Sequence, residues 1–211
     1  MELARKTESL GYGALTMPDH FTDQLAPLPA LTAAAMATST LRIGALVWDN
    51  DYKHPVVFAK EMATLDVLSD GRLDLGIGAG WMITDYEQSG IPYESAGTRI
   101  DKMIEGIDIM KGCFAQGPFS YDGKHYTITN YNGMPKPVQG TCPPILIGGG
   151  GKRVLTYAAK VADIVGINAT MSAGAVGPEA ISTMTAEAVD AKVDIVRDAS
   201  GDRINDIEMN I

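Results

Sequence analysis

His20 is the residue of this chain best placed for acid–base chemistry. It follows Pro18 and Asp19 at the end of the short apolar run 14–17, which predicts a buried strand. An imidazole at the end of such a strand can face a cavity, and a neighbouring carboxylate such as that of Asp19 can tune its basicity. The same position also suits a structural histidine that is hydrogen-bonded at a strand end. Spacing alone leaves both interpretations open.

A glycine-rich segment further along the chain could bind a phosphate group. Gly148–Gly151 follow an apolar run that predicts a strand, and Lys152 and Arg153 come next, where a helix is expected. Backbone N–H groups at the start of a helix can cradle a phosphate, and two cations would strengthen the attraction. A flexible tight turn is the alternative, but four glycines followed by two cations at such a junction favour phosphate binding.

Aromatic side chains also follow the predicted strands. Trp81 comes directly after Gly80, and Tyr86 and Glu87 lie a few residues later. Trp48 follows an earlier apolar run. An indole at the end of a strand could form one wall of a site for a flat ring. Packing in the core is the alternative for both tryptophans, and Glu87 also suits a solvated helix.

Several other chemistries lack support in the sequence. Gly76–Gly80 resembles a dinucleotide-binding fingerprint only superficially, because Trp81 stands where the third glycine belongs. No GxSxG motif of a serine nucleophile is present. His54, beside Pro55 at a helix entry, and His125, in a turn-rich segment, are expected to have surface roles. The three histidines and two cysteines follow no ligand spacing, so we expect no metal site.

Composition limits the partners that such a site could serve. The chain has 211 residues, 45% of them hydrophobic and 20% charged, and no linker tract or fixed-period repeat divides it. We therefore expect one domain over residues 1–211. Lys and Arg number 17 against 26 Asp and Glu, a formal charge of −9. Nucleic acids and anionic lipids attract clustered positive charge, so we expect neither as a partner and predict a small-molecule substrate.

The cysteines and the apolar stretches bear on cellular location. Cys113 and Cys142 lie far apart and in no CxxC spacing, which favours a reducing compartment over a disulfide framework. Polar residues interrupt the most apolar stretch, 31–48, and the N-terminus lacks a signal-peptide pattern. We therefore expect a cytoplasmic protein without a membrane span.

Helical and strand patterns alternate along most of the chain. The expected helices cover residues 3–10, 30–37, 55–68, 97–114, 154–160 and 185–199, and the expected strands cover 14–17, 41–47, 73–77, 145–147, 163–167 and 207–211. The segment of about 117–144, with an Asp122-Gly123 turn, interrupts them as a surface hairpin. Near-continuous apolar strands between helices predict a parallel sheet, either a closed (β/α)8 barrel or an open doubly wound sheet.

The order of these motifs resembles the bacterial luciferase-like monooxygenase superfamily, and within it the branch of oxidoreductases that use the deazaflavin coenzyme F420. The similar segments run in the same order over nearly the whole chain: residues 8–12, 18–21, 41–44, 70–81, 85–87, Arg99, 135–137, 143–151 and 162–165. Agreement over so many segments is more specific than any single motif.

The resemblance implies a TIM-type barrel with a flavin or deazaflavin ring lying across the carboxyl ends of its strands. Asp19 and His20 would then lie beside the ring, with His20 exchanging a proton with the substrate during hydride transfer. A cis non-proline peptide around Ala45-Leu46-Val47 would bulge under the ring. The resemblance also implies cofactor contacts from Ala45, Leu46, Ala79, Gly80, Trp81, Gly149, Gly150, Gly151, Lys152 and Arg153.

The resemblance leaves the cofactor and the substrate open. Hydride transfer between F420 and a small organic substrate is the first expectation. An FMN-dependent monooxygenase that uses O2 and a non-catalytic flavin-binding relative are the alternatives. Relatives that act on sugar phosphates have a glutamate where Trp81 stands, so we do not carry that activity over to this chain.

The predicted strands are fewer than those of a complete barrel. The chain begins within the first helix of the family pattern and ends at the seventh strand, so we expect an incomplete barrel that lacks the first and last strands. Unpaired strand edges invite pairing with another chain. Together with the resemblance, these edges predict a homodimer.

Overall fold

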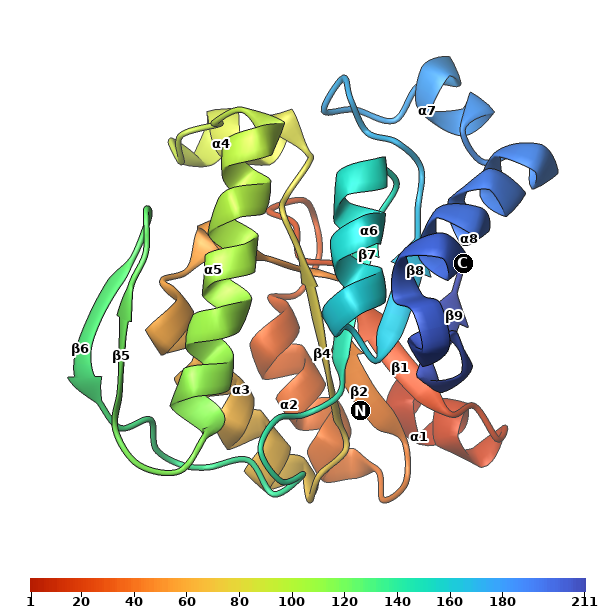
Figure 1. Ribbon diagram of the computed structural model, residues 1–211. Coiled ribbons are helices and arrows are strands. Elements are labelled where there is room, and N and C mark those ends of the chain that lie inside the picture. Colours follow the sequence, from red (N-terminus) through yellow and green to blue (C-terminus); the bar gives the residue numbers. More distant parts are fainter.

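The computed structural model describes residues 1–211, and helices and strands alternate along most of the chain (Figure 1). The helices are α1 (Glu2–Ser9), α2 (Pro27–Ala37), α3 (Pro55–Ser69), α4 (Ile83–Ser89), α5 (Ala96–Phe114), α6 (Lys152–Val161), α7 (Pro178–Ser182) and α8 (Ala186–Ser200). The strands are β1 (Ala14–Met17), β2 (Arg42–Ala45), β3 (Trp48–Asp49), β4 (Leu73–Gly78), β5 (Phe119–Asp122), β6 (Thr127–Tyr131), β7 (Ile145–Gly149), β8 (Ile164–Ile167) and β9 (Glu208–Asn210). Short 3-10 helices cover Asn50–Tyr52 and Gly201–Asp206.

The main sheet is parallel and has the order β1-β2-β4-β7-β8-β9, with the short β3 also paired to β4. It curls strongly. Arg42, at the start of β2, reaches Glu208, at the start of β9, with 3.3 Å between Nη2 and Oε1, although β4, β7 and β8 lie between those two strands in the sheet. Because β1 and β9 remain its two ends, the sheet is an incomplete barrel, as expected.

Strand β4 lies inside this sheet, and all six of its residues are buried. Two glycines allow β2 and β4 to approach closely. A Cβ atom at Gly76 would lie 1.9 Å from the carbonyl oxygen of Ala45, and one at Gly44 would lie 2.4 Å from that of Asp74. Continuous burial without polar alternation is typical of a parallel strand covered on both faces, which is the pattern that the sequence predicted.

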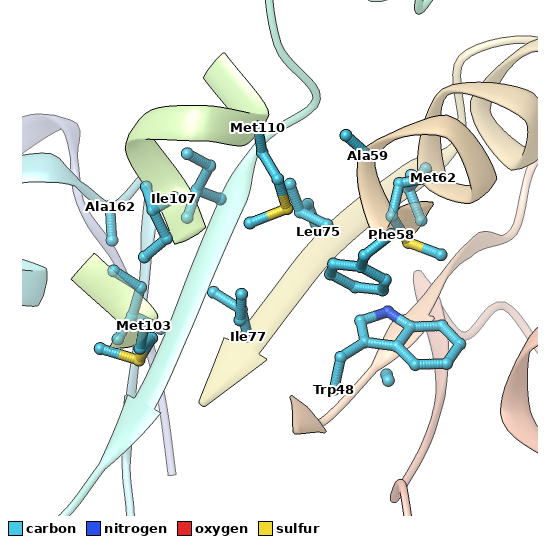
Figure 2. Close-up of a cluster of buried hydrophobic side chains, with 14 of the residues drawn as sticks. Trp48, Phe58, Ala59, Met62, Leu75, Ile77, Met103, Ile107, Met110 and Ala162 are labelled. Carbon is cyan, nitrogen blue, oxygen red and sulfur yellow. The ribbon is translucent and has the colours of Figure 1, made fainter. Parts of the chain in front are cut away.

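Helices α3 and α5 pack against β4 and build the core beside it. Figure 2 shows the side chains that meet there: Trp48, Phe58, Ala59, Met62, Leu75, Ile77, Met103, Ile107, Met110 and Ala162. Burying such side chains stabilises the fold by roughly 25 cal/mol per Å² of apolar surface. Trp48 is only 2% exposed, so it belongs to this core and not to a ligand site. None of the helices is long and apolar enough to cross a membrane.

Helix α3 has the start and the end that the sequence predicted. Pro55 occupies its first turn, and Nδ1 of the exposed His54 accepts a hydrogen bond of 3.3 Å from the backbone N–H of Val56. At the other end Asp70 and Gly71 have φ angles of 56° and 73°, which turn the chain out of the helix. His54 is therefore a helix cap on the surface.

The predicted hairpin is also present, as the antiparallel pair of β5 and β6. Its turn is fastened to α5 by Glu105, whose carboxylate accepts hydrogen bonds from the backbone N–H groups of Lys124, His125 and Tyr126 at 2.9, 3.0 and 3.2 Å. His125 thus lies in the hairpin, as expected. The hairpin packs beside the barrel helices, away from β9 (Figure 1).

The structure corrects the sequence prediction at several places. The strand expected over 41–47 is shorter, because β2 ends at Ala45. The cis peptide bond Leu46–Val47 that the resemblance implied follows it, and the short β3 begins only at Trp48. Gly148 and Gly149 belong to β7, so the glycine loop is shorter than expected, and α6 begins at Lys152. Helix α2 starts at Pro27 because proline suits the first turn of a helix. Helices α4 and α7 were not predicted.

Candidate active site

A cavity of about 470 Å³ opens at the carboxyl ends of the parallel strands. Its wall includes residues that follow β1, β4, β7 and β8 in the chain. Most of the residues that the sequence predicted for a site line it, namely Asp19, His20, Leu46, Ala79, Gly80, Trp81, Gly149, Gly150 and Gly151. The fold thus brings these distant segments together, while their binding roles stay predictions.

Three of the predicted cofactor contacts do not line the cavity. Ala45 is 1% exposed and lies within β2. Lys152 and Arg153 are exposed in the first turn of α6. The guanidinium of Arg153 donates hydrogen bonds to the carbonyl oxygen of Gly97, at 3.1 Å, and to the carboxylate of Asp101. That positive charge is therefore already paired within the chain.

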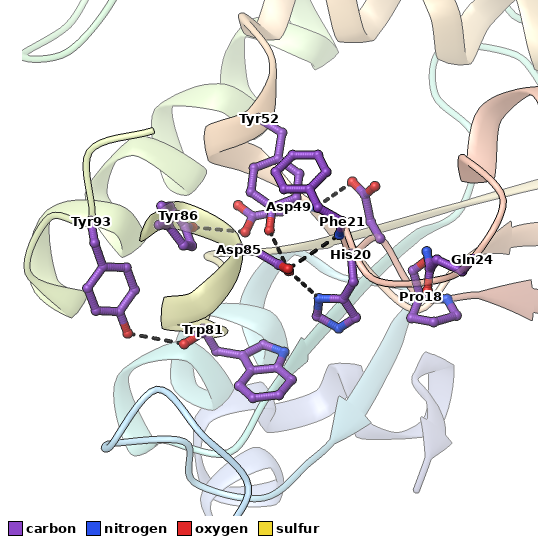
Figure 3. A network of polar contacts seen from close by, with 11 residues as sticks. Pro18, His20, Phe21, Gln24, Asp49, Tyr52, Trp81, Asp85, Tyr86 and Tyr93 are labelled. Atoms are coloured by element: carbon purple, nitrogen blue, oxygen red, sulfur yellow. Dashed lines mark hydrogen bonds and ion pairs between the residues drawn. The ribbon is translucent and has the colours of Figure 1, made fainter. Parts of the chain in front are cut away.

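His20 is held by a carboxylate from a distant part of the sequence. Its Nδ1 atom lies 2.7 Å from Oδ2 of Asp85, which belongs to α4 (Figure 3). The indole of Trp81 packs edge-on against the imidazole, with 5.4 Å between ring centroids and an interplanar angle of 86°. Asp19 is the neighbouring carboxylate expected from the sequence, but Asp85 makes the hydrogen bond.

Asp85 joins two further groups. Its Oδ2 atom accepts a hydrogen bond of 3.0 Å from the hydroxyl of Tyr52, and its Oδ1 atom accepts one of 3.3 Å from the backbone N–H of Phe21. The Phe21 and Tyr52 rings stack with centroids 4.5 Å apart. Burial is the main reason that the pKa of the Tyr52 hydroxyl is raised, so this group stays a donor. The segment after β1, the 3-10 helix and α4 therefore meet at one carboxylate.

The carboxyl group of Asp49, in the cavity wall, has a pKa raised toward neutral pH. Burial, with the charges of Asp51 and Asp19 adding to it, raises the pKa of Asp49 to about 7, against hydrogen bonds that lower it. Oδ2 of Asp49 accepts a hydrogen bond of 2.8 Å from the Tyr86 hydroxyl, and its Oδ1 accepts one of 2.9 Å from the backbone N–H of Asp51. Burial also raises the pKa of Asp19, whose Oδ2 accepts from the backbone N–H of Asp49 at 3.2 Å.

Arg99, on α5, fixes the segment that follows β4. It is only 5% exposed, and its guanidinium donates to the carbonyl oxygens of Ala79 at 3.2 Å and Gly80 at 3.4 Å. Its Cζ atom lies 4.1 Å from the ring centroid of Tyr93, within cation–π range. Arg99 thus holds the part of the wall that leads to Trp81.

The glycine segment forms the opposite part of the wall, against the loop that follows β8. A Cβ atom at Gly150 would lie 2.3 Å from the carbonyl oxygen of Ala169 and 2.5 Å from that of Asn168. The hydroxyl of Thr170 donates a hydrogen bond of 3.0 Å to the Gly150 carbonyl oxygen. Only glycine lets these two segments lie so close. Gly151, the next residue, has no atoms within 4 Å of its Cβ position.

Asp49 and Arg99 line the cavity and Asp85 holds His20, but none of the three had a predicted role. Asp85 and Arg99 belong to the segments that carry the family resemblance, and from the residues themselves no role followed. The available signals were weak. Arg99 stands beside Ile100 and Met103 on the apolar side of a predicted helix, and Asp49 follows a predicted strand. Asp85 lies in a segment with no helical period. Of the two candidate residues that follow Asp85 in the sequence, Tyr86 is buried and Glu87 is exposed.

A curled parallel sheet under helices, with a cavity at the carboxyl ends of its strands, defines the class of α/β-barrel proteins that bind ligands at that face. The family model described as luciferase-like monooxygenase matches residues 1–197, and the chain belongs to this family.

Two relatives represent different chemistries. The chain is 31% identical over 163 residues to a 5,10-methylenetetrahydromethanopterin reductase of Archaeoglobus fulgidus, covering 77% of this chain and 47% of that protein. It is 30% identical over 153 residues to an FMNH2-dependent dimethylsulfone monooxygenase of Pseudomonas putida, covering 72% of this chain and 40% of that protein. The chain spans about half the length of the curated relatives it matches.

A solved structure supports the fold. The coenzyme F420-dependent tetrahydromethanopterin reductase of Methanopyrus kandleri superposes with a TM-score of 0.81 at 23% identity. The superposition covers 99% of this chain and 59% of the reductase. Nearly the whole of this chain therefore follows the architecture of that part of the barrel which it covers.

Proposed function

We propose that this chain is an oxidoreductase that transfers a hydride between the deazaflavin coenzyme F420 and a small organic substrate. The observation that carries this proposal is the position of His20, which lines the cavity while its Nδ1 atom is hydrogen-bonded to Asp85. A proton-transfer group in that position complements hydride transfer, because a substrate that gives up or gains a hydride also exchanges a proton.

The cavity fits a flat ring system. Its volume of about 470 Å³ falls within the range of roughly 300–1,000 Å³ that is usual for small-molecule sites. Leu46, Val47, Ala79 and Ile167 supply apolar surface, and Gly78, Gly148 and Gly166 leave the strand ends without side chains. When bound there, F420 would supply the hydride-carrying centre. Leu46, which is 40% exposed, and Trp81 would orient the ring from the wall.

The phosphate of the cofactor is assigned to the start of α6. Gly149, Gly150 and Gly151 line the cavity, and no side chain caps the first N–H groups of this helix. Backbone N–H groups of residues 149–153 are therefore the proposed phosphate ligands. Lys152 adds an exposed positive charge nearby, whereas Arg153 contributes its backbone, since its side chain is paired with Asp101.

A monooxygenase that uses reduced FMN and O2 is the second candidate. It is favoured by the similarity to the FMNH2-dependent dimethylsulfone monooxygenase of Pseudomonas putida. A relative that binds a flavin without turnover is the third. All three share the cavity and differ in the ligand that fills it and in the fate of the proton at His20.

Paired fluorescence titrations with F420 and FMN separate these candidates. The proposal expects micromolar binding of F420 and weaker binding of FMN. Binding of FMN alone would favour the monooxygenase that uses reduced FMN and O2. Binding of neither cofactor would overturn the proposal of a flavin-type site in this chain. In a substrate screen, His20→Ala should retain cofactor affinity and lose turnover by about 100-fold or more. Light scattering on the same sample tests the expected homodimer.

A further inference from the structure

The imidazole of His20 has a carboxylate on one side and the cavity on the other. Asp85 is 3% exposed, and its two oxygens receive hydrogen bonds from the Tyr52 hydroxyl and the Phe21 N–H. A backbone N–H can only donate, and the Tyr52 hydroxyl remains protonated, so Asp85 acts as an acceptor toward both. The remaining partner, Nδ1 of His20 at 2.7 Å, then carries the proton and donates it to Oδ2.

No other carboxylate competes for this ring. Asp19, although adjacent in the chain, directs Oδ2 to the backbone N–H of Asp49. The carboxylate of Asp49 is occupied by the Tyr86 hydroxyl and the Asp51 N–H. The hydrogen bond from His20 is therefore made to Asp85 alone, across 65 residues of sequence.

The second ring nitrogen is left for the cavity. Nε2 of His20 makes no hydrogen bond within the chain, and it is not a buried atom. It is therefore reachable from the cavity that His20 lines. In Figure 3 the Nδ1 side of the ring faces Asp85, and the indole of Trp81 lies nearly perpendicular to the ring. With the proton on Nδ1, a neutral imidazole presents its lone pair at Nε2.

We infer that Asp85 is a positioning residue that fixes the tautomer and the orientation of His20, so that Nε2 serves as the proton acceptor in the cavity. This inference rests on the proposed function for the identity of the proton. Bound F420 would take up the hydride of a substrate C–H bond with its electron pair, and Nε2 of His20 would accept the proton of the substrate O–H or N–H group. The resulting imidazolium faces the Asp85 carboxylate, which stabilises its charge in a buried setting. In the reverse direction the imidazolium returns that proton.

Nitrogen-15 NMR of the histidine rings tests the tautomer without any cofactor. The chain has only three histidines, and the His20 signals are those that vanish in His20→Gln. At about pH 8.5, two units above the ordinary histidine pKa, the wild type should have Nδ1 protonated and Nε2 bare. In Asp85→Asn the amide can either donate or accept, so the Nε2–H tautomer should gain population.

Asp23→Asn is the matched control. Asp23 is exposed, lies three residues after His20 and forms no hydrogen bond or ion pair within the chain, so its substitution removes the same charge without touching the ring. The His20 spectrum should stay as in the wild type. With an identified substrate, Asp85→Asn should lower kcat by roughly 100-fold and change KM far less.

Two outcomes overturn the inference. One is a wild-type ring protonated at Nε2, a result that needs no variant and holds even where Asp85→Asn does not fold. The other is a folded Asp85→Asn chain whose tautomer is unchanged. Neither outcome depends on F420 or FMN, so failure of the cofactor titrations would count against the proposed function and leave the role of Asp85 to be judged by the spectra.

Discussion

The Nζ atom of Lys192, on α8, donates a hydrogen bond of 2.7 Å to the carbonyl oxygen of Asn168, directly after β8. It also donates to the carbonyl oxygen of Thr183 at 2.8 Å. Lys192 is only 6% exposed, and burial lowers the pKa of its amine. Because Asn168–Ser172 line the cavity, this lysine ties one wall of the site to the helix behind it.

Lys192→Met keeps most of the apolar stem and removes the donor. The carbonyl oxygens of Asn168 and Thr183 then lose this donor, so we expect the free energy of unfolding to fall by about 2 kcal/mol. Cofactor affinity should fall by about tenfold, because the loosened loop must be ordered on binding. Urea unfolding and the fluorescence titration measure both. Lys160→Met, at an exposed position of α6, is the control. Unchanged cofactor affinity in Lys192→Met would mean that the loop does not need this anchor.

The sequence was informative where a local pattern determines the structure. Strand β4 and helix α3 were predicted within a residue or two, because continuous apolar burial, a proline at the helix start and a left-handed turn at Asp70 and Gly71 all act over short distances. Helix α4 was missed because only Asp85 and Tyr86 of its seven residues are buried, which leaves no apolar period to detect.

The sequence predicted where the site lies, but not which side chains pair with one another there. His20 and the glycine segment were found because strand ends are recognisable in the sequence. The partner of His20 was not found, since 65 residues separate it from Asp85 and only the fold brings them to 2.7 Å. The pairing of Arg153 with Asp101 joins positions 52 residues apart and was hidden for the same reason.

Asp66 is another buried carboxylate, and it joins α3 to the segment that contains Val138 and Gln139. It is fully buried in α3, and it accepts hydrogen bonds from the backbone N–H groups of Val138 at 2.7 Å and Gln139 at 3.2 Å, and from Nε2 of Gln139 at 2.7 Å. Asp66→Ala would leave these donors without an acceptor, so we expect the free energy of unfolding to fall by about 2–4 kcal/mol. Denaturant unfolding measures it. Asp70→Asn, exposed and with a left-handed backbone that asparagine tolerates, should be nearly neutral.

The raised pKa of Asp49 predicts a pH dependence of stability. Its folded value of about 7 lies above the ordinary 3.8, so the folded chain binds more protons than the unfolded chain between these values. Stability contributed by this group is present at low pH and is lost as pH rises from about 4 to about 7. Asp49→Asn removes the titration. The variant should lose less stability than the wild type between about pH 5 and pH 8, by on the order of 2 kcal/mol.

Urea unfolding of both proteins at the two pH values measures this difference. Burial raises the pKa of Asp74 to about 6 as well, but that group is present in both proteins and cancels in the comparison. Asp23→Asn, which removes an exposed charge, should keep the wild-type dependence. Parallel pH profiles for Asp49→Asn and the wild type would refute a titrating Asp49.

The last prediction separates two adjacent glycines in the cavity wall. A methyl group at Gly150 would meet the carbonyl oxygens of Ala169 and Asn168 at 2.3 and 2.5 Å, and backbone atoms cannot swing aside. Gly150→Ala should therefore push the loop after β8 away, lower the free energy of unfolding by about 1–3 kcal/mol and weaken cofactor binding. At Gly151 the methyl group meets nothing within 4 Å, and its φ of −92° suits alanine. The free energy of unfolding of Gly151→Ala should lie within about 0.5 kcal/mol of the wild-type value. Equal stabilities for the two variants would mean that the close approach of the two loops does not constrain this wall.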